Sequence, residues 1–373
     1  MDPARRQAAA KEGCAGRVAP ERSRGAHSNP HNRFAQHQVL DFDDGWWREP
    51  EDATRKSPTV VAVDHSKTII STNRSPDVPF HQSLNPYRGC EHGCIYCFAR
   101  PSHEYLDLSL GRDFETRLFY KPDAVDQLEA FLQRPAYRCE PIALGINTDA
   151  YQPLEKNLQL TRQLLQVMLR YRHPVSLVTK GSLILRDLDI LQELAQLGLV
   201  SVMVSVTTLD DELKRIMEPR AAAPATRLKV IRRLRDAGVP VGVLLAPVIP
   251  FINDHELETI LRACGEHGAQ QAGYVLLRLP HQLKTLFGDW LDAHYLQRKE
   301  RVLNTMKDLH GGQLYRSGFG TRMQGQGIYA QLIRRRFQLA RDKYGLRDDS
   351  RQALRSDLFR VPGTAEQFSL GFG

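Results

Sequence analysis

Between residues 140 and 279, short apolar segments alternate with amphipathic segments whose apolar residues recur at helical spacing. This alternation predicts parallel strands joined by helices, because a strand buried on both faces of a sheet needs a nearly continuous apolar sequence. The strand-like segments are PIALGIN (141–147), VSLVTK (175–180), VSVMVSV (200–206), PVGVLLAPVI (240–249) and GYVLLRL (273–279). With the segment that precedes residue 90, about six strand–helix units result, enough for most of a barrel or for an open doubly wound sheet. No G-x-G-x-x-G motif follows a strand, which weakens a nucleotide-binding open sheet.

Polar residues recur where these strands end. In barrels and in open sheets alike, functional sites form at the C-terminal ends of the strands. The repetition therefore predicts one pocket built from several strand ends. Its expected residues are Asn147, Thr148, Asp149, Tyr151, Thr179, Lys180, Ser205, Thr207, Thr208, Pro247, Asn253 and Arg278.

Half of the six cysteines lie within eight residues, in the stretch RGCEHGCIYCFARP (88–101). Clustered thiolates hold zinc or iron–sulfur clusters, and a structural zinc site needs four ligands, whereas this C-x₃-C-x₂-C stretch offers Cys90, Cys94 and Cys97. His92 lies inside the loop and is a further ligand type. Three ligands leave a metal position open for a substrate or cofactor.

The other cysteines are poor candidates for a fourth ligand. Cys139 precedes a strand whose far end faces the expected pocket, which places it about 26 Å from that end at 3.3 Å per residue. Cys264 lies on the apolar face of a predicted helix, where a free cysteine packs as a small hydrophobe. Cys14 lies in a segment with almost no large apolar residues.

The C-x₃-C-x₂-C spacing, with Tyr96 before the last cysteine and a repeated strand–helix pattern after it, resembles the radical S-adenosylmethionine (SAM) superfamily. The resemblance implies an α/β fold, a partial (β/α)₆ TIM-like barrel. It also implies a [4Fe–4S] cluster held by Cys90, Cys94 and Cys97, with SAM bound to the open iron. An external low-potential electron donor would reduce the cluster, SAM would be split, and the 5′-deoxyadenosyl radical would take a hydrogen atom from a substrate.

Further stretches resemble uncharacterised radical SAM proteins related to spore photoproduct lyase, over roughly residues 66–290. They are NPYRGCEHGCIYCFAR, NTDAYQPLEK, LVTKGSLILRDLD, VSVTT, EPRAA, GVPVGVLLAPVIPFIND and VLLRLP. By this resemblance Lys180 and Ser205 hold the methionine carboxylate, and Thr148 and Asp149 receive the methionine amino group. The main chain at Tyr96 faces adenine, and Pro247 and Val248 form the far wall of the adenine pocket.

One departure concerns the hydrogen donor. The lyase uses a cysteine near the end of the second core strand, whereas LGINTDAY contains none. Repair of thymine photoproducts is therefore not expected. Tyr151, expected on an exposed loop, is an alternative donor, and the catalytic residue stays unassigned.

Four regions are expected along the chain. Residues 1–40 carry seven Arg/Lys against three acids and few large apolar residues, which predicts a disordered basic tail. Residues 41–83 form an N-terminal extension, and residues 84–290 form the core barrel. Residues 291–373 form a helical extension that closes the barrel as a lid. Leu332, Ile333, Phe337 and Leu339 are expected to pack on the barrel, while Tyr315, Arg316, Phe319 and Arg322 of the Gly-rich stretch 311–327 offer stacking and charge for a nucleic acid.

The net charge of +8 and pI of about 9.2 permit a polyanionic partner. Together with the arginine-rich stretch 334–355, this favours a macromolecular substrate, including RNA or DNA. The alternatives are a radical SAM enzyme that acts on a small metabolite and a non-enzymatic iron–sulfur or zinc-binding module with four ligands. No run of about 18 apolar residues and no secretory signal are found, so no membrane partner and a cytoplasmic location are expected. The pattern leaves the oligomeric state open.

Overall fold

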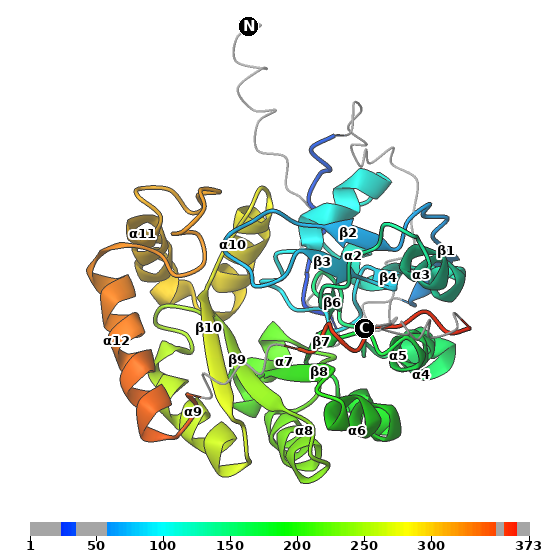
Figure 1. The fold of residues 1–373 in the computed structure, drawn as a ribbon. Helices are drawn as coiled ribbons and strands as arrows, with labels where there is room; N and C mark the ends of the chain where they lie inside the picture. Colours follow the sequence, from blue (N-terminus) through cyan, green and yellow to red (C-terminus); the bar gives the residue numbers. More distant parts are fainter. Residues whose placement is uncertain (1–23, 35–57, 348–353, 364–373) are drawn as a thin grey trace, which may run out of the picture.

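The computed structural model describes residues 24–34, 58–347 and 354–363. Its main element is a seven-stranded sheet in the order β10-β9-β8-β7-β6-β3-β2 (Figure 1). The strands from β3 to β10 in this sheet are parallel, and β2 pairs antiparallel with β3 at one edge. The bounds are β2 (Ile70–Thr72), β3 (Gln82–Leu84), β6 (Ile142–Leu144), β7 (Val175–Thr179), β8 (Val200–Ser205), β9 (Val241–Val248) and β10 (Gln271–Leu276).

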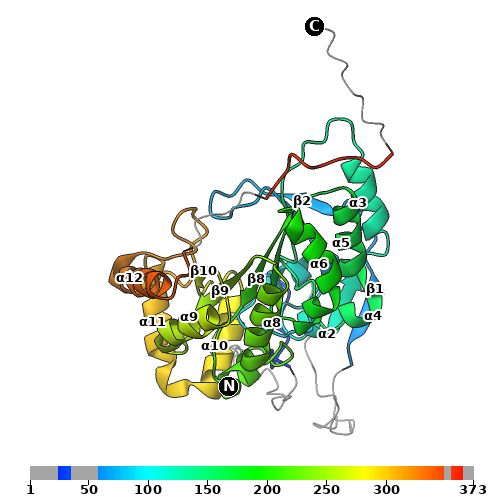
Figure 2. The ribbon, with the colours of Figure 1, turned by 60° about the horizontal axis from the view of Figure 1, so that its bottom comes forward.

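The order of the parallel strands follows the chain without a reversal. Right-handed connections between such strands place every connecting helix on the same face, whereas a doubly wound sheet reverses its order and has helices on both faces. Figure 2 shows these helices on the outer side of the sheet. The architecture is thus a partial (β/α)₆ barrel, which confirms the predicted fold class. The outer helices are α5 (Leu160–Arg170), α6 (Leu188–Gln196), α8 (Pro224–Asp236) and α9 (Leu257–Glu266).

The predicted strands and helical stripes correspond to elements of the barrel. The strands β7 to β9 bury alternate or nearly all residues, as a layer covered by helices requires. On the helices the buried side chains include Leu164, Leu165, Leu191, Leu194 and Ile231. Short elements complete the connections: α4 (Glu155–Leu158), η3 (Ser182–Asp187), α7 (Asp211–Met217) and η4 (Asp254–Glu256).

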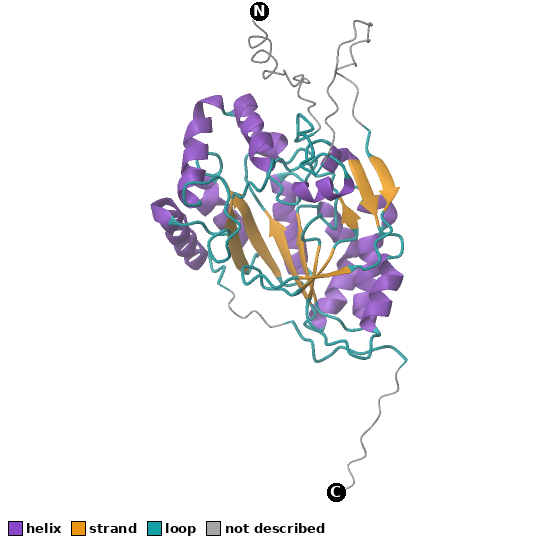
Figure 3. Ribbon diagram, turned by 90° about the horizontal axis from the view of Figure 1, so that it is seen from above, coloured by secondary structure: helices purple, strands orange, loops and turns teal. Residues whose placement is uncertain are grey.

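The connection between β3 and β6 is enlarged and carries the cysteines. It contains β4 (Tyr87–Arg88), η2 (Arg100–Leu106), α2 (Asp113–Thr116), β5 (Arg117–Tyr120) and α3 (Ala124–Leu132). In this region β5 pairs antiparallel with β4 and parallel with β1 (Val60–Val63), which gives a second, three-stranded sheet. Figure 3 shows this small sheet set apart from the large one.

The open side of the barrel, between β10 and β2, is crossed by residues 310–326, here called the strap. The strap follows α10 (Leu283–His294), η5 (Leu296–Arg298) and α11 (Lys299–Leu309), and precedes α12 (Gly327–Lys343). The Leu276 amide at the end of β10 donates to the Met323 carbonyl at 2.9 Å. Gly320 N donates to Asp77 Oδ1 at 2.7 Å, and Arg322 Nε lies 2.5 Å from Asp77 Oδ2. Because Asp77 belongs to the β2–β3 hairpin, the strap joins the two edges of the sheet.

The strap lies in the C-terminal region that is expected from the sequence to form a lid. Four apolar residues of α12 are expected to pack on the barrel. Two of them, Ile333 and Phe337, are buried. The expectation is wrong for Leu332 and Leu339, which are 51% and 62% exposed. They lie on the outer face of α12, where the helical spacing turns them away from the barrel.

Residues 24–34 differ from the predicted disordered tail. Arg24, Ala26 and Asn32 are buried, and the segment packs on the enlarged β3–β6 connection. The segment is held by backbone amides and by the polar side chains of Arg24 and Asn32 rather than by large apolar side chains, which is why composition alone indicates disorder. The rest of the predicted tail lies outside the described residues.

Residues 354–363 run across the opposite end of the barrel. Arg355 N donates to the Gly198 carbonyl at 3.1 Å, and Arg360 N donates to the Tyr171 carbonyl at 3.0 Å. Both acceptors precede barrel strands, so this segment covers the N-terminal ends of the strands. Among the described residues, no helix is long and apolar enough to span a bilayer.

Candidate functional site

The three cysteines lie on the loop after β4, at the C-terminal ends of the barrel strands. The loop is tied to the segments that follow two of those strands. Thr148 Oγ1, after β6, donates to the Tyr87 carbonyl at 3.0 Å. Ile95 N donates at 3.0 Å to the carbonyl of Met217, at the end of the helix that follows β8. The cysteine loop therefore lies against the segments that follow β6 and β8, where several of the predicted strand-end residues are found.

The cysteines fit an iron–sulfur cluster better than a single metal ion. All three are free thiols, two of them buried. Among the described residues, no three Cys, His, Asp or Glu side chains converge on a point that holds one ion, as a zinc site requires. A four-iron cluster binds its ligands at separate corners, so its cysteines need not converge on a point. Burial raises the pKa of Cys94 to about 12, so this thiol needs the positive charge of bound iron to become a thiolate.

The remaining described cysteines lie elsewhere, as the sequence predicts. Cys264 is fully buried in α9. Cys139 precedes β6 and interacts with Ser356 of the segment that covers the opposite end of the barrel. His92 does not extend the cysteine set, because its Nδ1 lies 3.3 Å from Asp149 Oδ2. Among the described cysteines, three therefore lie together at this loop.

A buried ion pair supports the backbone of the cysteine loop. Arg100, which is fully buried, donates to the carbonyl of Cys94 at 2.8 Å and to that of Gly93 at 3.1 Å. Its guanidinium also lies 2.5 Å from Glu115 Oε1. A planar guanidinium with five N–H donors suits this task, because it holds several carbonyls in fixed positions at once.

Residues 24–26 complete this support from the N-terminal side. Gly25 N and Ala26 N donate to the two carboxylate oxygens of Glu115 at 2.9 and 2.8 Å. Arg24 donates to the Glu115 carbonyl at 2.9 Å. The approach is close enough that a Cβ on Gly25 would lie 1.8 Å from the carbonyl oxygen of Gly93. Residues 24–26 thus form a clamp that presses on the cysteine loop.

Asp149 connects two strand ends with the cysteine loop. Its Oδ1 accepts from Tyr151 N at 2.9 Å and Thr179 Oγ1 at 2.7 Å, and its Oδ2 accepts from Lys180 N at 2.7 Å. Burial alone would raise the pKa of Asp149, but His92 and these hydrogen bonds lower it to about 2. A carboxylate has about four acceptor positions, and protein donors occupy them here. From the sequence, the Asp149 carboxylate is expected to receive the methionine amino group. In the structure, donors of the protein already occupy its acceptor positions.

A second buried network surrounds Tyr96. The Tyr96 hydroxyl donates to Glu218, which also accepts from Thr207 Oγ1 at 2.6 Å and pairs with Arg227. Burial alone would raise the pKa of Glu218, but Arg227 and Lys180 lower it to about 2. The ring of Tyr96 thus anchors the cysteine loop to the barrel interior instead of only filling space.

Lys180 and Ser205 face this network with groups that remain available. The Lys180 ammonium lies 5.8 Å from the centre of the Tyr96 ring. The carbonyl of Ser205 accepts from Arg227 at 3.1 Å, while its hydroxyl makes no hydrogen bond within the described part of the chain. A cation and a free hydroxyl at neighbouring strand ends can bind a carboxylate.

The end of β9 is fixed by Asn253. Its Nδ2 donates to the carbonyls of Pro247 and Thr207 at 2.9 and 2.8 Å, and its Oδ1 accepts from Ile249 N at 2.7 Å. Val248 is buried and its carbonyl accepts from Leu277 N at 3.0 Å. Pro247 and Val248 therefore form a fixed wall beside the strand ends.

Arg278 lies between the cysteine loop and the strap. Its guanidinium stacks 4.7 Å from the ring centre of Phe98, the residue after Cys97. Burial lowers the pKa of Arg278, and its interactions with Tyr315 and Arg322 place it under the strap. A charged side chain thus marks the mouth of the barrel.

Comparison with known proteins identifies the family. The family model of the radical SAM superfamily matches residues 84–264. An uncharacterised protein of Mycobacterium tuberculosis (strain ATCC 25618 / H37Rv) is 36% identical over 278 residues, which cover 74% of this chain and 78% of that protein. The chain belongs to the radical SAM superfamily. Another uncharacterised protein, from Methanocaldococcus jannaschii, is 25% identical over 191 residues. The aligned region covers 51% of this chain and 68% of that protein.

Solved structures support the same fold. Spore photoproduct lyase complexed with dinucleoside spore photoproduct has a TM-score of 0.55 and 14% sequence identity, covering 77% of this radical SAM chain and 79% of the lyase. At this identity the likeness concerns the fold. Radical SAM proteins are enzymes that use a [4Fe–4S] cluster and SAM, and these are the cofactors of this chain.

Several residues of the radical SAM site were not predicted from sequence. Arg100, Glu115, Gln152, Glu218 and Arg227 are fully or almost fully buried polar residues that hold the cysteine loop and its surroundings. For Glu218 a signal existed, since it lies in the EPRAA stretch of the family resemblance. Tyr151, expected on an exposed loop, is buried, and burial and Asp187 raise the pKa of its hydroxyl.

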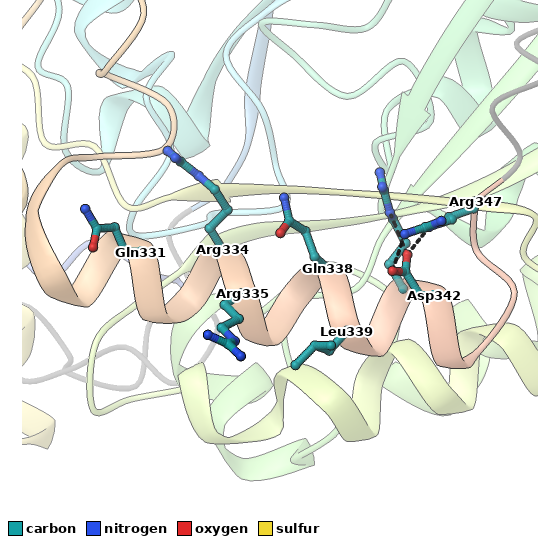
Figure 4. A pocket seen from close by; sticks show the side chains of 8 residues that line it. Gln331, Arg334, Arg335, Gln338, Leu339, Asp342 and Arg347 are labelled. Carbon is teal, nitrogen blue, oxygen red and sulfur yellow. Dashed lines mark hydrogen bonds and ion pairs between the residues drawn. The ribbon is translucent and has the colours of Figure 1, made fainter.

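A basic depression of about 560 Å³ lies along α12 (Figure 4), and none of the residues that line it belongs to the cysteine loop. It is lined by Arg334, Arg335, Gln338 and Arg347, among others. Arg347 pairs with Asp342, and the neighbouring Arg336 pairs with Glu258. Part of the positive charge of this helix is thus neutralised within the protein.

Proposed function

We propose that this enzyme binds SAM at the C-terminal ends of β6 to β9 and directs the resulting 5′-deoxyadenosyl radical at a nucleic acid. When bound and reduced by an external low-potential donor, the cluster would supply the electron that splits the SAM sulfonium. Cys90, Cys94 and Cys97 are the residues that would hold it. The observation that carries the proposal is the junction of the cysteine loop with Lys180 and Ser205, whose polar groups remain available beside it.

The SAM contacts follow from what each residue leaves free. Lys180 and Ser205 bind the methionine carboxylate. Thr148 lies on the wall that receives the amino group, and Asp149 acts mainly as a positioning residue, because protein donors occupy its acceptor positions. The main chain at Tyr96 faces adenine.

The adenine pocket has its far wall at Pro247 and Val248. Asn253 fixes the carbonyl of Pro247, which keeps that wall in place. The proposed site therefore combines free groups for the charged end of SAM with a rigid apolar wall for its base.

A nucleic acid is favoured as substrate because the chain carries a net charge of +8 and arginines at the mouth of its barrel. The lyase with the same fold binds a dinucleoside. No cysteine lies in the segment LGINTDAY that follows β6, so the cysteine hydrogen donor of the lyase has no counterpart there. The reaction therefore differs from photoproduct repair. The proposed location is the cytoplasm, where a low-potential electron donor is at hand.

The test is anaerobic reconstitution of the full chain, reduction with dithionite, and measurement of 5′-deoxyadenosine with and without cellular RNA or DNA. We expect formation that depends on all three cysteines and rises with nucleic acid. Replacing Lys180 by Gln should weaken SAM binding, while Lys229→Gln on α8 serves as control. If K180Q bound SAM as tightly as the wild type with a full cluster, the carboxylate assignment would be wrong. Stimulation by a small-metabolite extract alone would favour the alternative substrate class.

A further inference from the structure

Each strongly exposed aromatic ring of the described residues lies beside an arginine side chain. The large hydrophobic side chains with high exposure include four aromatic rings: Phe34 at 52%, Phe98 at 42%, Tyr105 at 71% and Phe319 at 61%. Each has an arginine over it. Arg33 lies 4.5 Å from the ring centre of Phe34 and 5.7 Å from that of Tyr105, Arg278 lies 4.7 Å from Phe98, and Arg322 lies 4.8 Å from Phe319.

These pairs surround the mouth of the barrel, although they come from three distant parts of the chain. Phe34 contacts Tyr105 with ring centres 5.1 Å apart, which joins the N-terminal segment to η2, just after the cysteine loop. Arg33 influences the pKa of His281, three residues after Arg278. Arg278 in turn interacts with Arg322 of the strap, which Figure 1 draws between α11 and α12. Phe98 lies just before η2 (Arg100–Leu106) and Tyr105 lies near its end, while Arg278 contacts Phe98 and lies close to the strap, so the pairs follow one another as a row.

The arginines of this row differ in what they bind. Arg33 pairs with Glu104, and Arg322 pairs with Asp77. Arg278 makes no salt bridge or hydrogen bond within the part of the chain that the structure describes, although it is half-buried. Asp77 and the Cys97 thiol lie within electrostatic reach of Arg278, but its guanidinium donors have no direct partner among the described residues and are available to an anion such as a phosphate.

We propose that this row binds single-stranded nucleic acid, with Arg278 contacting a phosphate and the exposed rings stacking on bases. This rests on the proposed function and adds the substrate's form and its contacts. Alternating aromatic rings and arginines are the features that bind unpaired strands, because every base has a face for stacking and every linkage has a charge. A duplex hides its base faces, so it cannot use the rings in this way.

The position of the row relates binding to chemistry. Phe98 follows Cys97 directly, and Arg278 lies two residues after the end of β10, the last barrel strand. A phosphate on Arg278 therefore places the attached nucleotide next to the open side of the cysteine loop. The N-terminal residues Arg33 and Phe34 extend the row beyond the barrel itself.

The test uses full-length protein with a complete cluster, under anaerobic conditions. Fluorescence anisotropy would measure binding of labelled single-stranded DNA and RNA of about 12 nucleotides, within the range of known single-strand sites, and of a duplex of equal length. Titrations between about 50 and 200 mM salt give the slope of log K against log salt. We expect single strands to bind more tightly than the duplex.

The variants separate the two kinds of contact. Arg278→Gln should lower the salt slope by about 0.7, the value for one phosphate contact on a single strand. Phe98→Leu and Tyr105→Leu should each weaken binding about five-fold or more without changing the slope. Arg233→Gln, on the exposed face of α8, is the matched control and should behave as the wild type.

Several outcomes would overturn the inference. They are the absence of single-strand binding by the loaded wild type, equal binding of the duplex, and unchanged binding and slope in R278Q. Loss of iron in R278Q with intact oligonucleotide binding would show that Arg278 serves the cluster instead. Measuring 5′-deoxyadenosine in the same samples keeps the two proposals apart. Binding without 5′-deoxyadenosine would count against the radical function, and 5′-deoxyadenosine without binding would count against the row.

Discussion

Replacing Gly25 by alanine tests whether residues 24–26 support the cluster site. The new Cβ would lie 1.8 Å from the Gly93 carbonyl oxygen, a contact that real structures do not contain, and the atom it meets is backbone. The clamp must therefore move away from the cysteine loop. This movement breaks the hydrogen bonds from Gly25 N and Ala26 N to the buried carboxylate of Glu115.

The expected cost follows from those two bonds. A hydrogen bond to a charged group contributes about 1.5–3 kcal/mol, so their loss amounts to about 3–6 kcal/mol. Because the segment can detach locally, global unfolding underestimates this effect. Trypsin cleavage after Arg24, which is buried in the wild type, reports local detachment, and iron content after anaerobic reconstitution reports the effect on the cluster.

The control is Gly288→Ala in α10, where an added Cβ meets nothing within 4 Å. A helical Gly→Ala change of this kind should stabilise the protein by about 0.5–1 kcal/mol. We expect G25A to be cut rapidly after Arg24 and to retain less iron, whereas G288A keeps the wild-type behaviour. Equal protection and equal iron in G25A and the wild type would refute the reasoning.

Three further predictions follow from the site and the core. Cys94→Ala should abolish the cluster, seen as loss of iron and of its brown absorbance; retained absorbance would contradict the ligand assignment. Glu218→Gln leaves the buried Arg227 without its counter-charge, which should cost about 3–5 kcal/mol in urea unfolding; an unchanged midpoint would argue against the pair. Burial lowers the pKa of His173 to about 4. Between pH 6.5 and 4 the unfolded state therefore binds the extra proton, and stability falls as the pH falls. His173→Gln should remove up to about 3 kcal/mol of that acid-induced loss, and equal acid profiles of H173Q and the wild type would contradict this.

The barrel could be predicted because its information is local. A strand such as VSVMVSV must be buried on both faces whatever surrounds it, and the stripe on α5 fixes which side of the helix faces the sheet. The strand-end residues follow from the same pattern, so the strand periodicity is enough to put Lys180 and Ser205 at one end of the sheet.

The support of the cysteine loop could not be predicted in the same way. Its bonds join backbone amides to side chains far along the chain, such as Gly25 to Glu115, 90 residues apart. No periodic pattern records such a pairing, and small residues such as Gly25 and Ala26 are typical of a tail. Asp149 illustrates a second limit: its position follows from the sequence, but the donors that occupy its carboxylate depend on the orientation of His92 and Thr179.

The strap determines how a polymeric substrate of the proposed kind could reach the site at the barrel mouth. The barrel's two sheet edges are joined near the mouth by an ion pair and a few hydrogen bonds around Asp77 rather than by a continuous strand ladder. Asp77 is almost fully buried and Arg322 is largely buried, but this join involves far fewer bonds than a strand ladder. If the substrate is a polymer, as proposed, opening these few contacts would let it be laid in sideways instead of being threaded.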